Sequence, residues 1–417
     1  MNTRLRFFFF SLLLFLSCSK NQITVPPTNP GTNLVNTVYI SDTVMKNMEG
    51  IYSLTAGDGG LGNEFVCKVS KFKVSFFSNN SGIFIILDYG FNRVDSSIQF
   101  AGFWRYSETA TQGLINFSVP KSAGASDLLL AGIIDHLQLT GNFADQNGGS
   151  ARPVTIAFKR PFSPYVLSHE FAIFAHHGVQ TTANPPYSQN SLKGALHDEE
   201  YGVLGLEFDV RLTKDNIPIC MHDASFDIRL TQKGPLYGDY SQYTFAFLEA
   251  YVRLPDGEQI PSVETVLDAF IDSTTMKYFW LDIKGDPDVF KYLEPVVRNA
   301  YARAAASHRN VVLIADLPSD DVIAEYKKQP SYGADLPCMC ELSLQDAIDN
   351  KCQYFGPRFS LGLLTDDVAK AHSLGIKVYS WTLNDKTIIL NYLQNGQFDG
   401  FISDYPAYVV YDYYALN

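Results

Sequence analysis

The sequence predicts a multidomain protein, with an N-terminal all-β sandwich or small barrel followed by a (β/α)8 TIM barrel. Short alternating apolar and polar runs, separated by Gly, Asn, Ser and Asp, fill residues 37–162 and are typical of antiparallel sheet. From Phe171 to Pro406, strand-like and helix-like segments alternate eight times, which favours parallel strands wrapped by helices. This length is close to the roughly 250 residues typical of such a barrel. A doubly wound open sheet is the alternative for this second domain.

The N-terminus carries an export signal. Two arginines precede the apolar run Phe7–Ser17, which is shorter than the about 20 residues needed to span a bilayer. The following Cys18 completes "FLSC", which resembles the lipobox of bacterial lipoproteins. We therefore expect residues 1–17 to be a signal peptide, Cys18 to be lipidated, and residues 18–36 to form a flexible linker. The alternative is an ordinary signal peptide that is cut further on, and both interpretations predict an exported protein.

The composition is that of ordinary globular material, at 46% hydrophobic residues and a formal charge of −12. This charge argues against nucleic acid as a nonspecific partner. Cysteines are too few for a disulfide scaffold. Cys338 and Cys340 share one strand face in the predicted pattern, where they either bind a metal or, as we favour, fill the core. The all-β domain shows no catalytic cluster, and its role and partner stay open.

The second domain is predicted over residues 168–417. Apolar runs predict its strands at 171–175, 204–212, 278–283, 310–316, 336–342, 352–359, 376–384 and 398–404. Amphipathic segments predict helices at 188–201, 262–271, 319–329, 343–350, 365–375 and 385–396. We expect the Tyr-rich tail after Pro406 to pack against the barrel.

Two carboxylates stand out inside the strand pattern "LGLEFDVRL". Side chains alternate faces along a strand, so Glu207 and Asp209 share one face, opposite Leu206, Phe208 and Val210. Ionised carboxylates are rarely buried unless they are paired or bind a cation. A hard cation with oxygen ligands would stabilise both groups.

A hairpin is expected directly after this strand. If Asp215 and Asn216 form a two-residue turn, Asp209 pairs with His222 on the returning strand. A three-residue turn would break this register.

Further candidates lie where barrel strands end, which is where barrel active sites are built. They are His176, His177, Asp282, Lys284, Trp381 and Asp404. Asp282 and Lys284, two residues apart, are predicted to share a face.

Taken in order, these motifs resemble those of the glycerophosphodiester phosphodiesterases, barrel enzymes related to phosphatidylinositol-specific phospholipases. The family's "HRG", "E-x-D" and "HD" are matched by "HHG", "EFD" and "MHD". Its "IPTLEEVL", "E-x-K", "WTVN" and "GIITDYP" are matched by "IPSVETVL", "DIK", "WTLN" and "GFISDYP". The resemblance spans about the whole second domain, and it is the order of the motifs that is specific.

This resemblance implies metal-dependent hydrolysis of glycerophosphodiesters to glycerol 3-phosphate and an alcohol. It implies a divalent cation, Ca²⁺ or Mg²⁺, and assigns these roles: Glu207, Asp209 and Asp282 bind the cation, His176 and His222 serve as acid and base, and His177, Gln189, Lys284 and Trp381 bind substrate. With the lipobox, it implies a protein anchored in the bacterial cell envelope, in the periplasm or on the outer membrane. Two alternatives stay open. One is a phospholipase that acts on intact lipids, and the other is a non-catalytic lipoprotein that binds phosphodiesters or glycans.

Three residues depart from the family pattern. His177 replaces the usual Arg, a phosphate clamp that is always charged, so we expect substrate binding to weaken above roughly pH 7. Gln189 stands where the family's "PENT" element has a carboxylate, and Asp282 replaces a Glu. Three interpretations of these changes stay open: an altered substrate, an altered choice of metal, or a decayed site that only binds.

Overall fold

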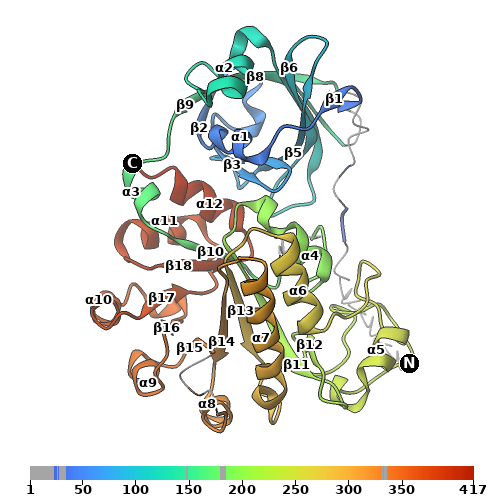
Figure 1. The fold of residues 1–417 in the computed structure, drawn as a ribbon, viewed down its shortest axis with the longest axis vertical. Helices are drawn as coiled ribbons and strands as arrows, with labels where there is room; N and C mark the ends of the chain where they lie inside the picture. Colours follow the sequence, from blue (N-terminus) through green and yellow to red (C-terminus); the bar gives the residue numbers. More distant parts are fainter. Residues whose placement is uncertain are drawn as a thin grey trace, which may run out of the picture.

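The computed structural model describes residues 23–25, 27, 34–146, 149–178, 185–330, 332 and 336–417. The predicted signal peptide, Cys18 and most of the predicted linker lie outside these residues. In the part of the chain that is described, no helix is both long and apolar enough to cross a membrane. The described residues form two barrels, one stacked on the other (Figure 1).

The N-terminal domain is a closed antiparallel barrel rather than a sandwich. Each strand from β2 to β9 pairs with the next along the chain, and β9 pairs with β2, so within the described residues eight strands form a closed meander. Its elements are β1 (Thr37–Val38), α1 (Asp42–Met45), η2 (Lys46–Met48), β2 (Gly50–Gly57), η3 (Gly59–Leu61), β3 (Glu64–Ser70), β4 (Lys73–Ser78), β5 (Phe84–Asn92), β6 (Ser97–Arg105), β7 (Gln112–Val119), η4 (Lys121–Ala123), α2 (Ala125–Ala131), β8 (Gln138–Asp145) and β9 (Arg152–Arg160).

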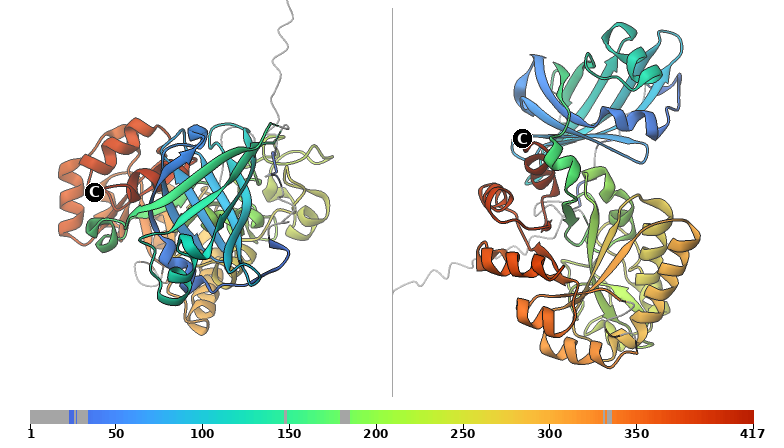
Figure 2. Two further views of the ribbon diagram at one scale, coloured as in Figure 1. Left: turned by 90° about the horizontal axis from the view of Figure 1, so that it is seen from above. Right: turned by 60° about the vertical axis from the view of Figure 1, so that its left-hand side comes forward.

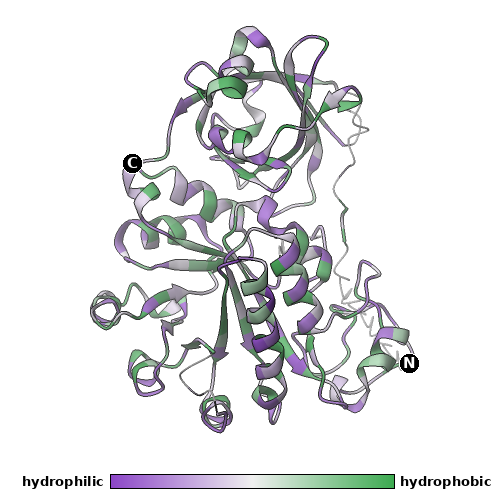
Figure 3. Cartoon of the chain, in the orientation of Figure 1, coloured by the Kyte–Doolittle hydropathy of each residue, from purple (hydrophilic) through white to green (hydrophobic). Residues whose placement is uncertain are grey.

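The alternating pattern of these strands sends every second side chain into the barrel. The interior is filled by large apolar residues, among them Tyr52, Phe76, Phe100, Trp104 and Phe117, all buried. A small barrel filled in this way has a packed core and no channel. Figure 3 shows apolar residues concentrated along the strands of both barrels.

The C-terminal domain is a closed parallel barrel, as predicted, and not an open doubly wound sheet. Strands β10, β11, β13, β14, β15, β16, β17 and β18 pair in that order, and β10 also pairs with β18, which closes the ring within the described residues. Its elements are α3 (Pro164–Ser168), β10 (Ala172–Ala175), α4 (Leu192–His197), η5 (Asp198–Tyr201), β11 (Gly205–Leu212), β12 (Pro218–Cys220), η6 (Tyr240–Gln242), α5 (Phe245–Tyr251), α6 (Val263–Ser273), β13 (Tyr278–Ile283), α7 (Val289–Ala306), β14 (Val312–Leu317), α8 (Asp320–Lys327), β15 (Cys338–Cys340), α9 (Leu344–Asp349), β16 (Tyr354–Phe355), η7 (Phe359–Leu361), α10 (Thr365–Ser373), β17 (Lys377–Ser380), α11 (Lys386–Asn395), β18 (Gly400–Ser403) and α12 (Pro406–Tyr414).

Most predicted helices form, with two differences. The segment predicted as one helix at 188–201 is α4 followed directly by the tighter η5. The long helix α7 was not predicted, and it contains Pro295, a residue that normally ends a helix. Its apolar face nevertheless packs in the barrel core through residues such as Leu293 and Val297, which shows tertiary packing outweighing a local signal.

Aromatic side chains fill the inside of the parallel barrel. Phe174 packs against Tyr278, Trp280 and Tyr379, with ring centroids 5.9, 5.8 and 5.1 Å away. This layer forms a solid plug, so polar groups at the carboxyl ends of the strands lie above an apolar floor.

The two barrels share helix α12, which lies at their junction (Figure 2). Tyr411 of α12 donates a hydrogen bond to Glu64 of β3 at 2.8 Å, while Val409 is buried in the same core as Phe77 of the N-terminal barrel. Phe84 also packs edge-on against Tyr201 of η5, with centroids 4.9 Å apart. The expected packing of the Tyr-rich tail is therefore confirmed, and it covers both barrels.

The cysteines of the second domain lie in the core. Cys338 and Cys340 are fully buried beside apolar residues between strands and helices. Their complete burial among apolar side chains confirms the core interpretation.

Candidate active site

The carboxylates of β11 lie where the alternating pattern predicts. Glu207 and Asp209 are buried, at 2% and 0% exposure, while Leu206, Phe208 and Val210 face the helix layer. In the parallel pairing of β11 with β13, Asp282 lies beside Asp209. One oxygen from each of Glu207, Asp209 and Asp282 lies within 4.8 Å of the others, so the three residues form one cluster.

This cluster has the properties of a cation site. Glu207 Oε1 is buried and accepts no hydrogen bond from any described residue, while Asp209 Oδ1 is buried with Lys284 Nζ 2.8 Å away. Buried carboxylate oxygens without a donor are costly unless a positive charge faces them. Oxygen ligands in this number fit a divalent cation, so the residues present fit the predicted metal.

The predicted hairpin register is wrong by one residue. β11 pairs with β12 so that Val210 lies opposite Cys220 and Leu212 opposite Pro218. The turn holds three residues instead of two, since Thr213 bonds to Ile217 across it; Asn216 adopts a φ of 61°. Asp209 therefore faces Met221, whose backbone N–H donates to Asp209 O.

His222 still reaches the site from the end of β12. A nitrogen of its ring lies within 4.8 Å of ligand atoms of both Asp209 and His177. Its Nδ1 lies 2.7 Å from Asp223 Oδ1, and Arg229 donates to Asp223 Oδ2 at 2.8 Å. Burial would raise the pKa of Asp223, but the hydrogen bonds from His222 and Arg229 lower it below its ordinary value. A carboxylate can only accept, so Nδ1 carries the proton and Nε2 is left for chemistry.

His176 is held in a matching way at the end of β10, the strand that pairs with β11. Its Nδ1 lies 2.6 Å from Asp404 Oδ1, and Asn384 donates to Asp404 Oδ2 at 2.6 Å. Burial would raise the pKa of Asp404, but the hydrogen bond and charge of His176 hold it below its ordinary value. His176 Nε2 is 3.9 Å from Glu207 Oε2. Asp404, a strand-end candidate, thus lies behind His176.

His177 turns towards the carboxylates. Its φ is 52°, and its Nδ1 lies 2.9 Å from Asp209 Oδ2 and 3.2 Å from Glu207 Oε2. Burial would lower the pKa of His177, but Asp209 and Glu207 outweigh this and raise the pKa well above its ordinary value. The weakening of binding expected above pH 7 assumed an ordinary pKa, so these carboxylates move any such effect to higher pH.

Lys284 and Asn190 complete the surroundings of Asp209. Lys284 Nζ lies 2.8 Å from Asp209 Oδ1 and 2.7 Å from Asp282 Oδ2, which confirms that Asp282 and Lys284 share a face. Asn190 Nδ2 donates to Asp209 Oδ2 at 2.5 Å, and its Oδ1 accepts from the Asp209 backbone N–H at 3.0 Å. Burial raises the pKa of Asp209, yet the charges of His177 and Lys284 hold it well below its ordinary value. Burial raises the pKa of Asp282 despite Lys284.

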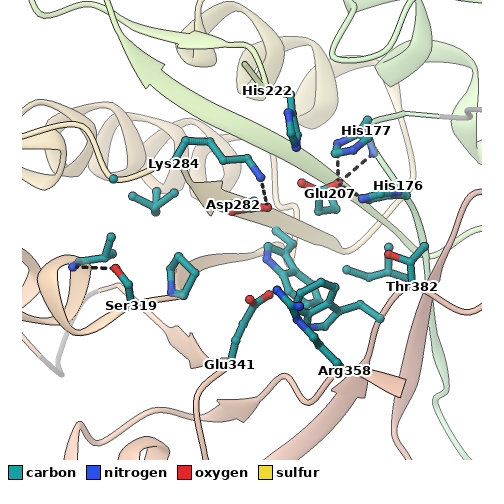
Figure 4. Close-up of a pocket in the computed structure, with 17 residues that line it drawn as sticks. His176, His177, Glu207, His222, Asp282, Lys284, Ser319, Glu341, Arg358 and Thr382 are labelled. Carbon is teal, nitrogen blue, oxygen red and sulfur yellow. Dashed lines mark hydrogen bonds and ion pairs between the residues drawn. The ribbon is translucent and has the colours of Figure 1, made fainter. Parts of the chain in front are cut away.

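The three histidines, Glu207, Asp282 and Lys284 line one cavity of about 490 Å³ at the carboxyl ends of the strands. Figure 4 shows His176, His177 and His222 gathered around Glu207, with Glu341 and Arg358 across the cavity. Every residue of this lining comes from the C-terminal barrel: His176, His177, Glu207, His222, Trp280, Asp282, Ile283, Lys284, Gly285, Pro318, Ser319, Val322, Glu341, Arg358, Trp381, Thr382 and Ile402. Trp381 is thus in the cavity wall, as expected for a substrate contact.

Two predicted site residues, Gln189 and Asp209, do not line this cavity; Asp209 lies beside it in the carboxylate cluster, whereas Gln189 makes no hydrogen bond to the site. Its amide atoms are buried without a hydrogen-bond partner in the described residues, and the adjacent Asn190 makes the contact with the site. The only signal for Asn190 was its place in the "SQNS" element.

Two cavity residues were missed by the sequence reasoning. The guanidinium of Arg358 lies 4.7 Å from the ring centroid of Trp381 and forms no ion pair with a carboxylate of the described chain. Glu341 follows β15, and burial raises its pKa to about 8. Neither residue lies in a motif, so only the strand-end position could have indicated them.

Part of the chain is similar in sequence to known phosphodiesterases. Residues 176–299 match the model of the glycerophosphoryl diester phosphodiesterase family. The chain is 24% identical over 245 residues to a glycerophosphodiester phosphodiesterase of Caldanaerobacter subterraneus, covering 57% of this chain and 96% of that one. It is 25% identical over 214 residues to YhdW of Bacillus subtilis, also named as such a phosphodiesterase, covering 50% and 85%.

The chain is also similar to a solved Oleispira antarctica phosphodiesterase in complex with the product sn-glycerol-3-phosphate. The two are 20% identical with a TM-score of 0.47, over 59% of this chain and 98% of that one. The matched segment 176–299 holds both cavity histidine motifs and all three clustered carboxylates. The C-terminal barrel is therefore similar in sequence, over residues 176–299, to the glycerophosphoryl diester phosphodiesterase family.

Proposed function

We propose that this protein is a phosphoric diester hydrolase that cleaves glycerophosphodiesters into glycerol 3-phosphate and an alcohol with the help of a divalent cation. One observation carries this proposal. Two histidines, each bound through Nδ1 to an aspartate, line the same cavity as Glu207 and Asp282, two of the three clustered carboxylates. Paired acid and base groups beside a cation site are what phosphodiester cleavage requires.

The cation would be held by Glu207, Asp209 and Asp282, Ca²⁺ or Mg²⁺ by resemblance to the family. When bound, it would polarise the phosphoryl group and neutralise developing charge. Lys284, beside two of these carboxylates, adds a fixed positive charge for the phosphoryl oxygens.

The two histidines divide the proton transfers. One accepts at Nε2 the proton of the attacking group, which is water or a neighbouring hydroxyl of the substrate. The other donates its Nε2 proton to the leaving alcohol oxygen as the P–O bond breaks. When the substrate hydroxyl attacks, a cyclic phosphate forms, and water then opens it to glycerol 3-phosphate with the same two histidines in exchanged roles. Asp404 and Asp223 hold the rings in the tautomer that leaves Nε2 available and stabilise the imidazolium form.

The test uses protein lacking residues 1–18 and a panel of glycerophosphodiesters, with Ca²⁺, Mg²⁺ or chelator. We expect release of glycerol 3-phosphate that chelator, Glu207→Ala and His222→Ala each abolish. Binding of the same compounds without turnover under any metal would instead support a non-catalytic binding protein.

Intact phospholipids belong in the same panel. The loops between β12 and α6 expose Ile228, Tyr237, Phe247 and Tyr251, and apolar side chains near a barrel mouth favour contact with acylated substrates. Faster cleavage of the acylated than of the deacylated compounds would replace the proposed substrate class with phospholipids.

We also propose that Cys18 is acylated and anchors the protein in a bacterial cell envelope. The basis is the lipobox-like "FLSC" and the Pro- and Asn-rich segment that follows. Fractionation and mass spectrometry of wild-type protein and Cys18→Ser test this: the wild type is expected in the membrane fraction with acyl mass on Cys18, and the variant is not.

A further inference from the structure

The Nδ1 atom of His177 has different neighbours from the Nδ1 atoms of the other two cavity histidines. His176 and His222 each direct Nδ1 at an aspartate outside the cluster. His177 Nδ1 instead lies between Glu207 and Asp209, and it makes a regular hydrogen bond to neither within the described residues. It is a buried nitrogen beside the carboxylate of Glu207, whose Oε1 has no hydrogen-bond partner among the described residues.

The spacing of these atoms fits ligation of one ion. Donor atoms about 2.0 to 2.2 Å from one ion lie about 3.0 to 3.4 Å apart when they are neighbours around it. His177 Nδ1 lies 2.9 Å from Asp209 Oδ2 and 3.2 Å from Glu207 Oε2. His177 is also a member of two of the three groups in the described chain whose atoms could hold a metal ion.

The backbone holds the ring in this position. The His177 N–H donates to Glu207 Oε2 at 2.9 Å, and its carbonyl accepts from Asn190 N–H at 2.7 Å. The ring stacks on His176 at 3.6 Å between centroids, and the residue is 7% exposed. A ring held so rigidly suits a ligand better than it suits a mobile clamp for a substrate phosphate.

We propose that His177 Nδ1 is a ligand of the cation that Glu207 and Asp209 hold, and that this mixed nitrogen and oxygen site prefers Zn²⁺ to Ca²⁺ or Mg²⁺. Imidazole suits Zn²⁺ and other transition metals, whereas Ca²⁺ and Mg²⁺ take oxygen ligands. The proposal rests on the cation site of the proposed function and specifies which ion fills it.

The first experiment measures binding of Zn²⁺ and of Ca²⁺ by calorimetry to metal-stripped protein lacking residues 1–18. His177→Asn tests the ligand, because Asn tolerates a positive φ and offers an oxygen in place of the nitrogen. We expect the preference for Zn²⁺ over Ca²⁺ to fall about tenfold or more in this variant. The matched control is His372→Asn, which removes a histidine that contacts Asp399 away from the cavity and should leave both affinities unchanged.

The second experiment needs no variant of the site. Ring ¹⁵N NMR of wild-type protein with one equivalent of Zn²⁺ distinguishes a ring bound through Nδ1 from rings that carry a proton there. His176 and His222 hold Nδ1 protons against aspartates, so an Nδ1-bound ring among the three cavity histidines is His177, even if His177→Asn folds poorly. Sequence-specific assignment of the ring signals separates it from the five histidines outside the cavity.

The outcomes separate this inference from the proposed function. Zinc binding with no Nδ1-bound ring, or an unchanged Zn²⁺ to Ca²⁺ preference in His177→Asn, overturns the role of His177 and leaves the cation site intact. Failure of wild-type protein to bind any divalent cation overturns both. Hydrolysis by the calcium-loaded enzyme without an Nδ1-bound ring supports the proposed function and rejects the inference.

Discussion

His176 Nδ1 and Asp404 Oδ1 lie 2.6 Å apart although the two residues are separated by 228 positions in the chain. The contact joins the end of β10 to the end of β18, the two strands whose pairing closes the parallel barrel. Closure of the barrel thus assembles the first histidine and aspartate pair of the site.

Asp404→Asn should lower kcat by about 10²- to 10⁴-fold with a much smaller effect on KM. An amide can donate to Nδ1, which favours the wrong tautomer of His176 and no longer stabilises its charged form. Steady-state kinetics on the best glycerophosphodiester measure this. An effect on KM alone, or no effect on kcat, would contradict the positioning role; thermal unfolding of the variant serves as the control for folding.

Asp223→Asn should also lower kcat, but less than Asp404→Asn does. The side chain of His222 is 39% exposed whereas that of His176 is 23% exposed. Water therefore replaces more of the stabilisation that Asp223 gives to the charged ring of His222. Arg229→Gln, which removes only the donor behind Asp223, should have the smallest effect of the three. A reversed order in parallel assays would show that the His222 pair is the more important one.

Arg358→Ala should raise KM by about 10- to 100-fold, since a charged hydrogen bond is worth roughly 1.5 to 3 kcal/mol. Arg358 lines the cavity above Trp381 without a carboxylate partner in the described chain, and an anionic substrate would supply one. Arg358→Lys keeps the charge but not the planar fork and should raise KM less. Equal KM values for the wild type and Arg358→Ala would place the phosphate elsewhere.

The raised pKa of Glu341 predicts how stability depends on pH. Burial raises this pKa from 4.5 to about 8, so between these values the folded state keeps a proton that the unfolded state has lost. The contribution of Glu341 to stability is fully present below pH 4.5 and is lost as the pH rises to about 8. Urea unfolding across this range should therefore show a shallower decline for Glu341→Gln than for the wild type. Some decline should remain, because burial also raises the pKa of Asp316; equal slopes would contradict the prediction.

The sequence predicted the parts of the site that follow from local rules. The shared face of Glu207 and Asp209 follows from the period of two in a strand, and the strand-end positions of His176 and Asp282 follow from the architecture. The register of His222 depended on the length of one turn, which the residues "KDN" allow to be two or three.

Contacts between distant segments could not be predicted in this way. The pairing of His176 with Asp404 depends on barrel closure. Arg358 reaches the cavity because its backbone pairs with that of Trp381, the residue that follows β17. The choice of Asn190 over Gln189 depends on which side chain of one turn points at Asp209, since Asn190 adopts a φ of 55°.

Both barrels depend on helix α12 to bury apolar surface. The apolar outer face of the antiparallel barrel, which includes Val66, Phe77 and Phe84, is buried in the core that α12 and η5 complete. That face belongs to the first half of the chain, but its cover includes the last helix. A chain that ends before Pro406 would therefore expose apolar surface on both barrels. We expect such a chain to aggregate during folding.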